Sequence, residues 1–226
     1  MRTIGGNHIA LCLLGIFLLS GLVITLAVSN LIHSSSISSN AIQRHEYVQR
    51  GLFYECLTLI NNDQATCNKI GASAKVTNLP SYLAYSRFAV IAATVLCFIA
   101  TVCSLLGNPF MRCCKFNHKV MTFVTAGSYL LSGILSLVAY SWYTNAAMNN
   151  YVEIMGEQLH NDGGKFSNTV SQWDLGWGMY IGFVTSILAI LGSVHACVVA
   201  VKLQKIGDVV NDMEDYNFKE GESSYI

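Results

Sequence analysis

Apolar residues fall into four long runs separated by polar stretches, and this pattern predicts the main elements of the chain. Each run is about as long as the roughly 20 residues that a helix needs to cross a bilayer core about 30 Å thick. The predicted transmembrane spans are approximately residues 9–31, 88–107, 120–142 and 179–203. Two long polar loops, 32–87 and 143–178, and a polar tail, 204–226, complete the pattern.

Composition supports the membrane interpretation. The chain has 226 residues, of which 53% are hydrophobic and 12% are charged, whereas a soluble domain carries about 25% charged residues. Its formal net charge is zero, so nothing in the composition favours binding to nucleic acid.

The first apolar run has two readings. Arg2 precedes it and Ala27-Val28-Ser29 has small residues at the spacing of a signal-peptide cleavage site. The run is, however, longer than the 7–15 residues typical of the apolar region of a signal peptide. We therefore expect it to remain as a transmembrane helix.

Basic residues set the predicted orientation. The short loop between the second and third spans contains Arg112, Lys115 and Lys119, and Lys202 and Lys205 follow the last span at once. Short loops rich in Lys and Arg stay on the cytoplasmic side. Both termini are therefore predicted to be cytoplasmic, and both long loops extracellular.

The first long loop is predicted to form a small sheet. Residues 47–60 are rich in strand-favouring types and Asn61-Asn62-Asp63 is a turn signal, so Cys56 and Cys67 fall on the two arms of a hairpin. Extracellular thiols oxidise. We predict a Cys56–Cys67 disulfide that contributes about 2–3 kcal/mol, with two free thiols as the alternative. The loop is long enough for three or four antiparallel strands, and the serine-rich Ser34–Ser39 is expected to be a mobile exit from the membrane.

Two motifs in this loop resemble those of the claudin family. One is Gly51-Leu52-Phe53 followed by Cys56 and Cys67, and the other is Leu79-Pro80-x-x-Leu83-x-x-x-Arg87. The wider tetraspan superfamily, including peripheral myelin and epithelial membrane proteins and calcium-channel gamma subunits, shares the first motif. The resemblance implies a left-handed four-helix transmembrane bundle that carries a small extracellular antiparallel β-sheet.

Later segments narrow the resemblance, and some departures qualify it. Ser141-Trp142-Tyr143-Thr144-Asn145 is similar to the end of the claudin third span, and Asp174-Leu175-Gly176 resembles the entry to the fourth. Claudins usually have a Trp early in the first loop, which Ser29–Ser36 lacks, and a Trp where this chain has Phe53. The second loop is longer than in most claudins and lacks their Phe-Tyr-Asn-Pro segment, so the resemblance does not establish head-on adhesion through this loop.

The resemblance implies a protein of cell junctions. Free sheet edges pair with neighbours, and claudins associate side by side, in cis, to form a paracellular barrier or ion channel. In claudins, the positions just after each of the two cysteines tend to face the pore. With one acidic residue of the turn added, the candidate pore-lining residues are Thr58, Asn68, Lys69 and Asp63, each of which is otherwise a solvated loop residue. The alternative function is an auxiliary or signalling subunit that regulates another membrane protein, such as a calcium or receptor channel.

The remaining candidates concern the membrane boundary and the cytoplasm. Arg87 either extends its side chain toward the membrane surface or pairs with the sheet and fixes its tilt; we expect the second role. Cys113 and Cys114 are candidates for palmitoylation, with unmodified thiols as the alternative. The acidic tail is predicted to be disordered, and its end, Ser224-Tyr225-Ile226, has the pattern that a PDZ domain binds.

No pattern typical of an enzyme is present in the sequence. It has no glycine-rich phosphate loop, no Cys/His spacing for zinc and no Ser-His-acid set with a supporting context. We expect a non-enzymatic protein without a metal or cofactor.

Overall fold

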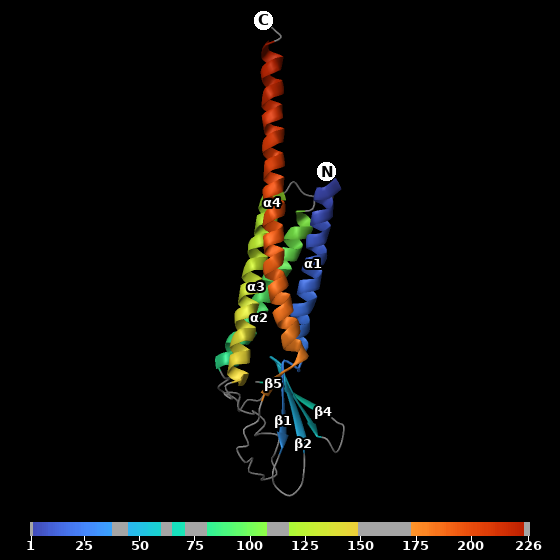
Figure 1. Cartoon of the computed structure of the whole chain (residues 1–226), viewed down its shortest axis with the longest axis vertical. Helices are drawn as coiled ribbons and strands as arrows, with labels where there is room; N and C mark the ends of the chain where they lie inside the picture. The colour runs from blue at the N-terminus through green and yellow to red at the C-terminus, as the bar shows by residue number, and fades with distance from the viewer. Residues whose placement is uncertain are drawn as a thin grey trace.

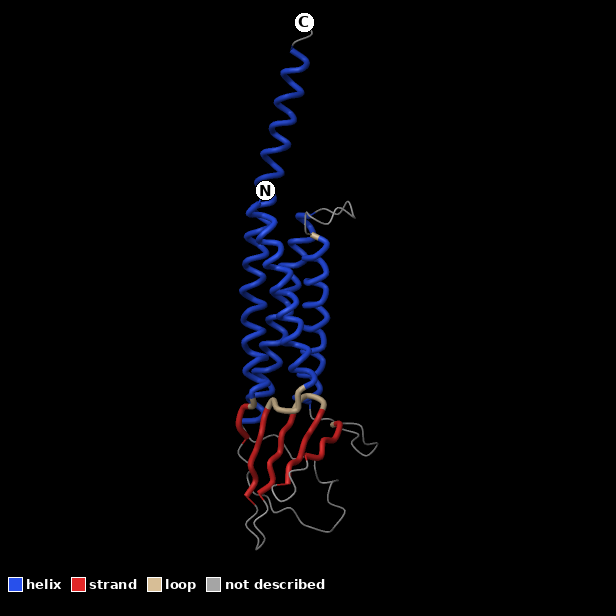
Figure 2. Tube along the Cα trace, turned by 90° about the vertical axis from the view of Figure 1, so that its right-hand side faces the viewer, coloured by secondary structure: helices blue, strands red, loops and turns tan. Residues whose placement is uncertain are grey.

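The computed structural model of the chain describes residues 2–37, 45–59, 65–70, 81–107, 118–148 and 173–223. The described residues form four helices and one five-stranded sheet. The helices run alongside one another, the sheet lies at one end of the bundle, and the last part of one helix extends beyond the other end (Figures 1 and 2). The helices are α1 Arg2–Ala27, α2 Ser81–Leu106, α3 His118–Met148 and α4 Trp177–Ser223.

The sheet is antiparallel in every pairing that joins its strands. Its strands are β1 Ile32–Ile37, β2 His45–Arg50, β3 Tyr54–Leu59, β4 Ala65–Lys69 and β5 Trp173–Leu175. Their order is β4-β3-β2-β1-β5. The first long loop thus supplies four consecutive strands, and the second long loop adds a short strand beside β1.

Small residues allow the helices of the bundle to approach closely. Each helix packs mainly against two others, in the cyclic order α1, α2, α3, α4. Gly182 of α4 faces the ring of Tyr140 on α3, and a Cβ on Gly182 would come within 2.7 Å of ring atoms. Lipid provides no hydrophobic drive between helices, so association depends on such close packing.

Interhelical hydrogen bonds add to this packing. The Thr25 and Tyr140 hydroxyls are 2.6 Å apart and join α1 to α3. The Ser132 hydroxyl donates to the Ala93 carbonyl at 2.7 Å, and Ser186 donates to Ser136 at 2.8 Å. These bonds satisfy polar groups that have no water to bind at this depth.

The outer surface of the bundle identifies where the bilayer lies. All four helices contain a segment long and apolar enough to cross a membrane. Large aromatic side chains are exposed near the ends of the helices that adjoin the sheet: Tyr85, Phe88, Trp142, Trp177 and Tyr180. Trp and Tyr concentrate at the membrane–water interface. The sheet therefore sits just outside one face of the bilayer.

Several boundaries differ from those predicted. α1 ends at Ala27 instead of near residue 31, because Leu31 bonds to the sheet through its N–H, which donates to the Arg50 carbonyl at 3.1 Å. α2 begins at Ser81 instead of near residue 88, so Arg87 lies within a helix. Apolar runs locate a span well, but the ends of the helix depend on tertiary contacts, which the hydropathy of the sequence does not report.

Two segments expected to be irregular are regular. Ser34, Ser35 and Ser36 belong to β1, because β2 pairs with all of them and β5 pairs with Ser34, whereas Ser38 and Ser39 lie outside the described residues. α4 continues to Ser223, through most of the tail that was predicted to be disordered. Extending a helix that has already formed avoids the cost of nucleation, which explains the continuation.

Substitution of Gly182 tests the close packing of α3 and α4. We expect Gly182→Ala to lower the free energy of unfolding by about 1–3 kcal/mol, because the new methyl group would overlap the Tyr140 ring. The matched control is Gly127→Ala on α3, where a Cβ meets nothing within 4 Å; it should be neutral or stabilising by up to about 1 kcal/mol. Unfolding of the purified protein in detergent measures both, and equal effects of the two substitutions would contradict the packing.

Candidate functional site

The disulfide lies in the two strands at one side of the sheet. Cys56 of β3 is opposite Cys67 of β4 in the register, and their sulfur atoms are bonded at 2.04 Å. The predicted disulfide is therefore present. It fixes the alignment of β3 and β4, and a slip of one residue would turn every side chain of a strand to the other face.

The turn between β2 and β3 rests on the end of the bundle. The Gly51 N–H donates to the Tyr54 carbonyl at 2.8 Å and closes the turn. A Cβ on Gly51 would collide with the Val28 carbonyl oxygen and come within 2.9 Å of the Ser29 Cα, both backbone atoms just after α1. Leu52 is buried in a cluster with residues of α2, α3 and α4. These residues are Leu83, Val90, Tyr140, Tyr143 and Met179.

Arg87 of α2 holds the hairpin that contains the disulfide. Its Nε donates to the Leu52 carbonyl at 2.5 Å, and its Nη2 donates to the Ile70 carbonyl at 3.3 Å. Leu52 lies just before β3 and Ile70 just after β4, so one side chain binds both ends of the hairpin. The guanidinium carbon also lies 5.0 Å from the centre of the Phe53 ring. These contacts match the structural role expected of Arg87, and the phenyl ring at position 53 takes part through a cation–π contact.

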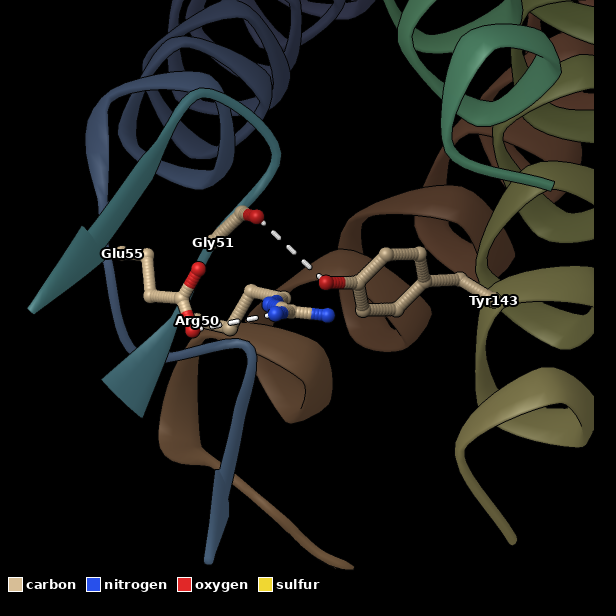
Figure 3. Close-up of polar contacts among 4 residues, drawn as sticks. All are labelled: Arg50, Gly51, Glu55 and Tyr143. Atoms are coloured by element: carbon tan, nitrogen blue, oxygen red, sulfur yellow. Dashed lines mark hydrogen bonds and ion pairs between the residues drawn. The ribbon is translucent and has the colours of Figure 1, made fainter. Parts of the chain in front are cut away.

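A buried ion pair lies beside this turn, between β2 and β3. Arg50 and Glu55 are opposite each other in the register, and Arg50 Nη2 is 3.0 Å from Glu55 Oε1. The Arg50 side chain is fully buried, and its guanidinium lies between the Glu55 carboxylate and Tyr143 of α3 (Figure 3). The Tyr143 hydroxyl donates to the Gly51 carbonyl at 3.3 Å. This cluster therefore joins the sheet to a second helix.

Sequence reasoning missed the role of Arg50 and Glu55. In the sequence, Arg50 and Glu55 are only two of the charged residues of a long polar loop. The available signal was weak: an arginine immediately before Gly51-Leu52-Phe53 and an acid five residues later. That spacing places two residues opposite each other only when a short turn lies between them, which the residues alone do not fix.

The second long loop is tied to the same junction. The Gly176 N–H donates to the Leu31 carbonyl at 2.7 Å, and the Gly178 N–H donates to the Asn30 carbonyl at 3.1 Å. β5 and the start of α4 are thus bound to the segment that connects α1 with β1. The sheet is therefore in contact with the ends of all four helices.

The candidate pore-lining residues do not form one cluster. Lys69 is exposed at the end of β4, opposite Tyr54, and Asn68 is opposite Glu55. Because consecutive strand positions belong to opposite faces, a wall built from one face includes only one of positions 68 and 69. Thr58 pairs with Tyr47 and Ala65. The other candidates, Asp63, Cys113, Cys114 and Ser224-Tyr225-Ile226, lie outside the described residues.

Side chains that bind metal ions do not cluster in the part of the chain that the structure describes. Among the described residues, no group of three or more His, Cys, Asp or Glu side chains is arranged to hold a metal ion. The structural features that bear on function in this part of the chain are the sheet, its edges and the contacts that hold it on the bundle.

Removal of one partner of the buried ion pair tests its place in the junction. We expect Glu55→Gln to destabilise the protein by about 3 kcal/mol, because the Arg50 charge stays buried without its carboxylate. The double variant Arg50→Met/Glu55→Met should recover most of this loss, since apolar replacement of a buried pair is often neutral. Lys69→Met, at an exposed position, is the control. A double variant as unstable as Glu55→Gln would show that the pair is not the cause.

Comparison with known proteins agrees with this architecture. The model of the PMP-22/EMP/MP20/Claudin family matches residues 10–195, which run from within α1 to within α4 and include the whole sheet. The chain is 29% identical to mouse claudin-14 over 195 residues, which cover 83% of this chain and 74% of claudin-14. It is 26% identical to mouse claudin-1 over 162 residues, 70% of each chain. It is 25% identical to bovine claudin-15 over 169 residues, 72% of this chain and 61% of claudin-15. The chain therefore belongs to the PMP-22/EMP/MP20/Claudin family, within which it is similar to claudins.

Proposed function

We propose that this protein assembles laterally in the plasma membrane at cell–cell junctions and forms a paracellular barrier or ion channel. A claudin-like tight-junction protein is embedded in the membrane and associates with itself, and family membership supports that general role. The observation that supports lateral assembly is the fixed position of the sheet on the helix bundle. Arg87 and Tyr143 bind its turn from two helices, so every copy presents its sheet edges at the same height above the bilayer.

Seated sheets with open edges suit a continuous seal. The outer side of β4 pairs with no other strand in the part of the chain that the structure describes. An unpaired strand edge is a template for association with another chain. Side-by-side contacts between copies of one orientation generate rows, and a row that meets the membrane of the next cell narrows the space between them.

The charges of the sheet favour a barrier or a weak anion preference over a cation channel. Selectivity in a pore comes from rings of charged or polar side chains. Lys69 is exposed at the sheet edge and is the one charged residue directly after the two cysteines. Thr58 and Asp63 remain candidates for the same wall, and Asn68 is a candidate for a wall built from the opposite face.

The orientation follows from the charges at the bundle's other end. Lys202 and Lys205 are exposed there, Arg112 and Lys115 belong to the loop that joins α2 to α3, and Lys119 lies in the first turn of α3. These residues support a cytoplasmic location for both termini and an extracellular sheet. Cys113 and Cys114 would then be accessible for palmitoylation, and Ser224-Tyr225-Ile226 for scaffold proteins with PDZ domains.

Expression in cells that lack junctional strands tests the proposal. We expect the protein to form continuous strands at cell contacts and to raise transepithelial resistance, because rows of seated sheets close the intercellular space. Freeze-fracture microscopy and resistance measurements give the two readouts, and dilution potentials give the ion preference.

One result in particular would replace the proposal with its alternative. A protein that reaches the surface as a dispersed monomer, leaves resistance unchanged, and co-purifies with a channel whose gating it alters would be an auxiliary subunit. Cells that express the same protein without residues 224–226 provide the control, since loss of the PDZ motif should leave strand formation itself intact.

A further inference from the structure

The two edges of the sheet carry opposite charges. Lys69 lies at the end of β4, which forms one edge, and Asp174 lies in the middle of β5, which forms the other. Both side chains are exposed. Neither forms an ion pair with any other residue that the structure describes. Among the described residues, each edge therefore presents one exposed charge without an ion-pair partner.

The register places both charges on the same face of the sheet. Directly opposed residues cross it in one row: Asp174, His33, Gln49, Cys56 and Cys67. Opposed residues share a face, and so do residues two apart on a strand. Lys69 is two residues beyond Cys67, so Lys69 and Asp174 both lie on the face that carries the disulfide. They differ in height above the bundle by only two residues.

The strand directions allow one edge to meet the other. β4 leads into α2 and β5 leads into α4, so both strands run toward the bundle. Copies in one bilayer share one orientation. A copy displaced sideways therefore brings its β5 alongside β4 of its neighbour, in parallel, with the disulfide faces on the same side. In this arrangement Lys69 approaches Asp174 of the neighbouring copy.

The other simple arrangement does not use these charges. Rotation by half a turn about the membrane normal places β4 beside a second β4 and turns the two disulfide faces to opposite sides. The two Lys69 side chains then lie on opposite faces, and Asp174 remains at the far edges. Such a contact is closed and joins two copies only, whereas the displaced arrangement repeats without closing.

We propose that Lys69 and Asp174 select the lateral contact between copies of this chain, with β4 of one copy beside β5 of the next. The inference rests on the proposed lateral assembly and names the contact that produces it. β5 has three residues, so it offers few backbone hydrogen bonds to a neighbour. Complementary charge sets the register and suppresses wrong partners where the contact is short.

Charge reversal tests this contact because its two partners differ. We expect Lys69→Asp alone and Asp174→Lys alone each to reduce the total strand length per cell about tenfold, since like charges then meet at every contact. Co-expression of the two variants should restore strands, because an alternating row again pairs opposite charges at each contact. The double variant should also assemble by itself. Lys202→Asp, a reversal of an exposed charge on the part of α4 that lies away from the sheet, should assemble like the unmodified protein.

Surface biotinylation establishes that each variant reaches the membrane. If a reversal does not, the neutral variants Lys69→Gln and Asp174→Asn take its place. Each should then lose long strands alone and should be restored only in part by mixing, because in an alternating row every second contact still pairs Lys69 with Asp174 while the others carry no ion pair. Neutral variants that assemble normally would overturn the proposal.

The outcomes separate this contact from other roles. Absence of strands from the unmodified protein would refute the proposed function itself. Normal strands from it and from both reversals would refute only the edge pairing, as would reversals that reach the surface and stay unassembled when mixed. Loss with Lys69→Asp but not with Asp174→Lys would also refute the edge pairing, since Lys69 would then act without Asp174. Normal strands with altered ion preference in Lys69→Asp would make Lys69 a pore residue instead.

Discussion

The placement of the sheet depends on the guanidinium group of Arg87. It donates to the carbonyls of Leu52 and Ile70, which lie at the two ends of the disulfide-linked hairpin, and it packs over Phe53. Strand ends that meet the bundle need donors for carbonyls that water does not reach. Because the disulfide and the strand pairing transmit the position of the hairpin to the other strands, one side chain of α2 orients the whole sheet.

The neighbouring contacts make this position specific. Tyr143 binds the Gly51 carbonyl, and the main chain at Val28 leaves no room for a side chain on Gly51. The Arg50–Glu55 pair adds little net stability, because burying two charges costs about as much as their attraction returns. If the sheet took another position and the two residues separated, a charge would stay buried without its partner. The pair therefore disfavours any other position of the sheet. A uniquely seated sheet is what repeated edge contacts between copies require.

The sequence predicts the bundle well and the sheet in part. Spans follow from apolar runs, a local signal, and the disulfide follows from two cysteines that flank a turn in a loop expected to be extracellular. The edge strand β5 was not predicted, because it comes from the second long loop and pairs with β1, far away in the sequence. The serines of β1 have little strand preference, and only their neighbours make them a strand. The pairing of Arg50 with Glu55 likewise depends on a register that becomes visible only when the strands are placed.

Hydrogen exchange on an Arg87 variant measures the central constraint most directly. In Arg87→Gln, amide protection should fall in residues 51–56 and 67–70, at both ends of the hairpin, while the buried segments of α2 and α3 keep theirs. The cysteine pair should stay oxidised, which shows that the hairpin has formed but is no longer seated. Unchanged protection at both hairpin ends would contradict the role of Arg87, and so would a loss confined to the helix that carries it.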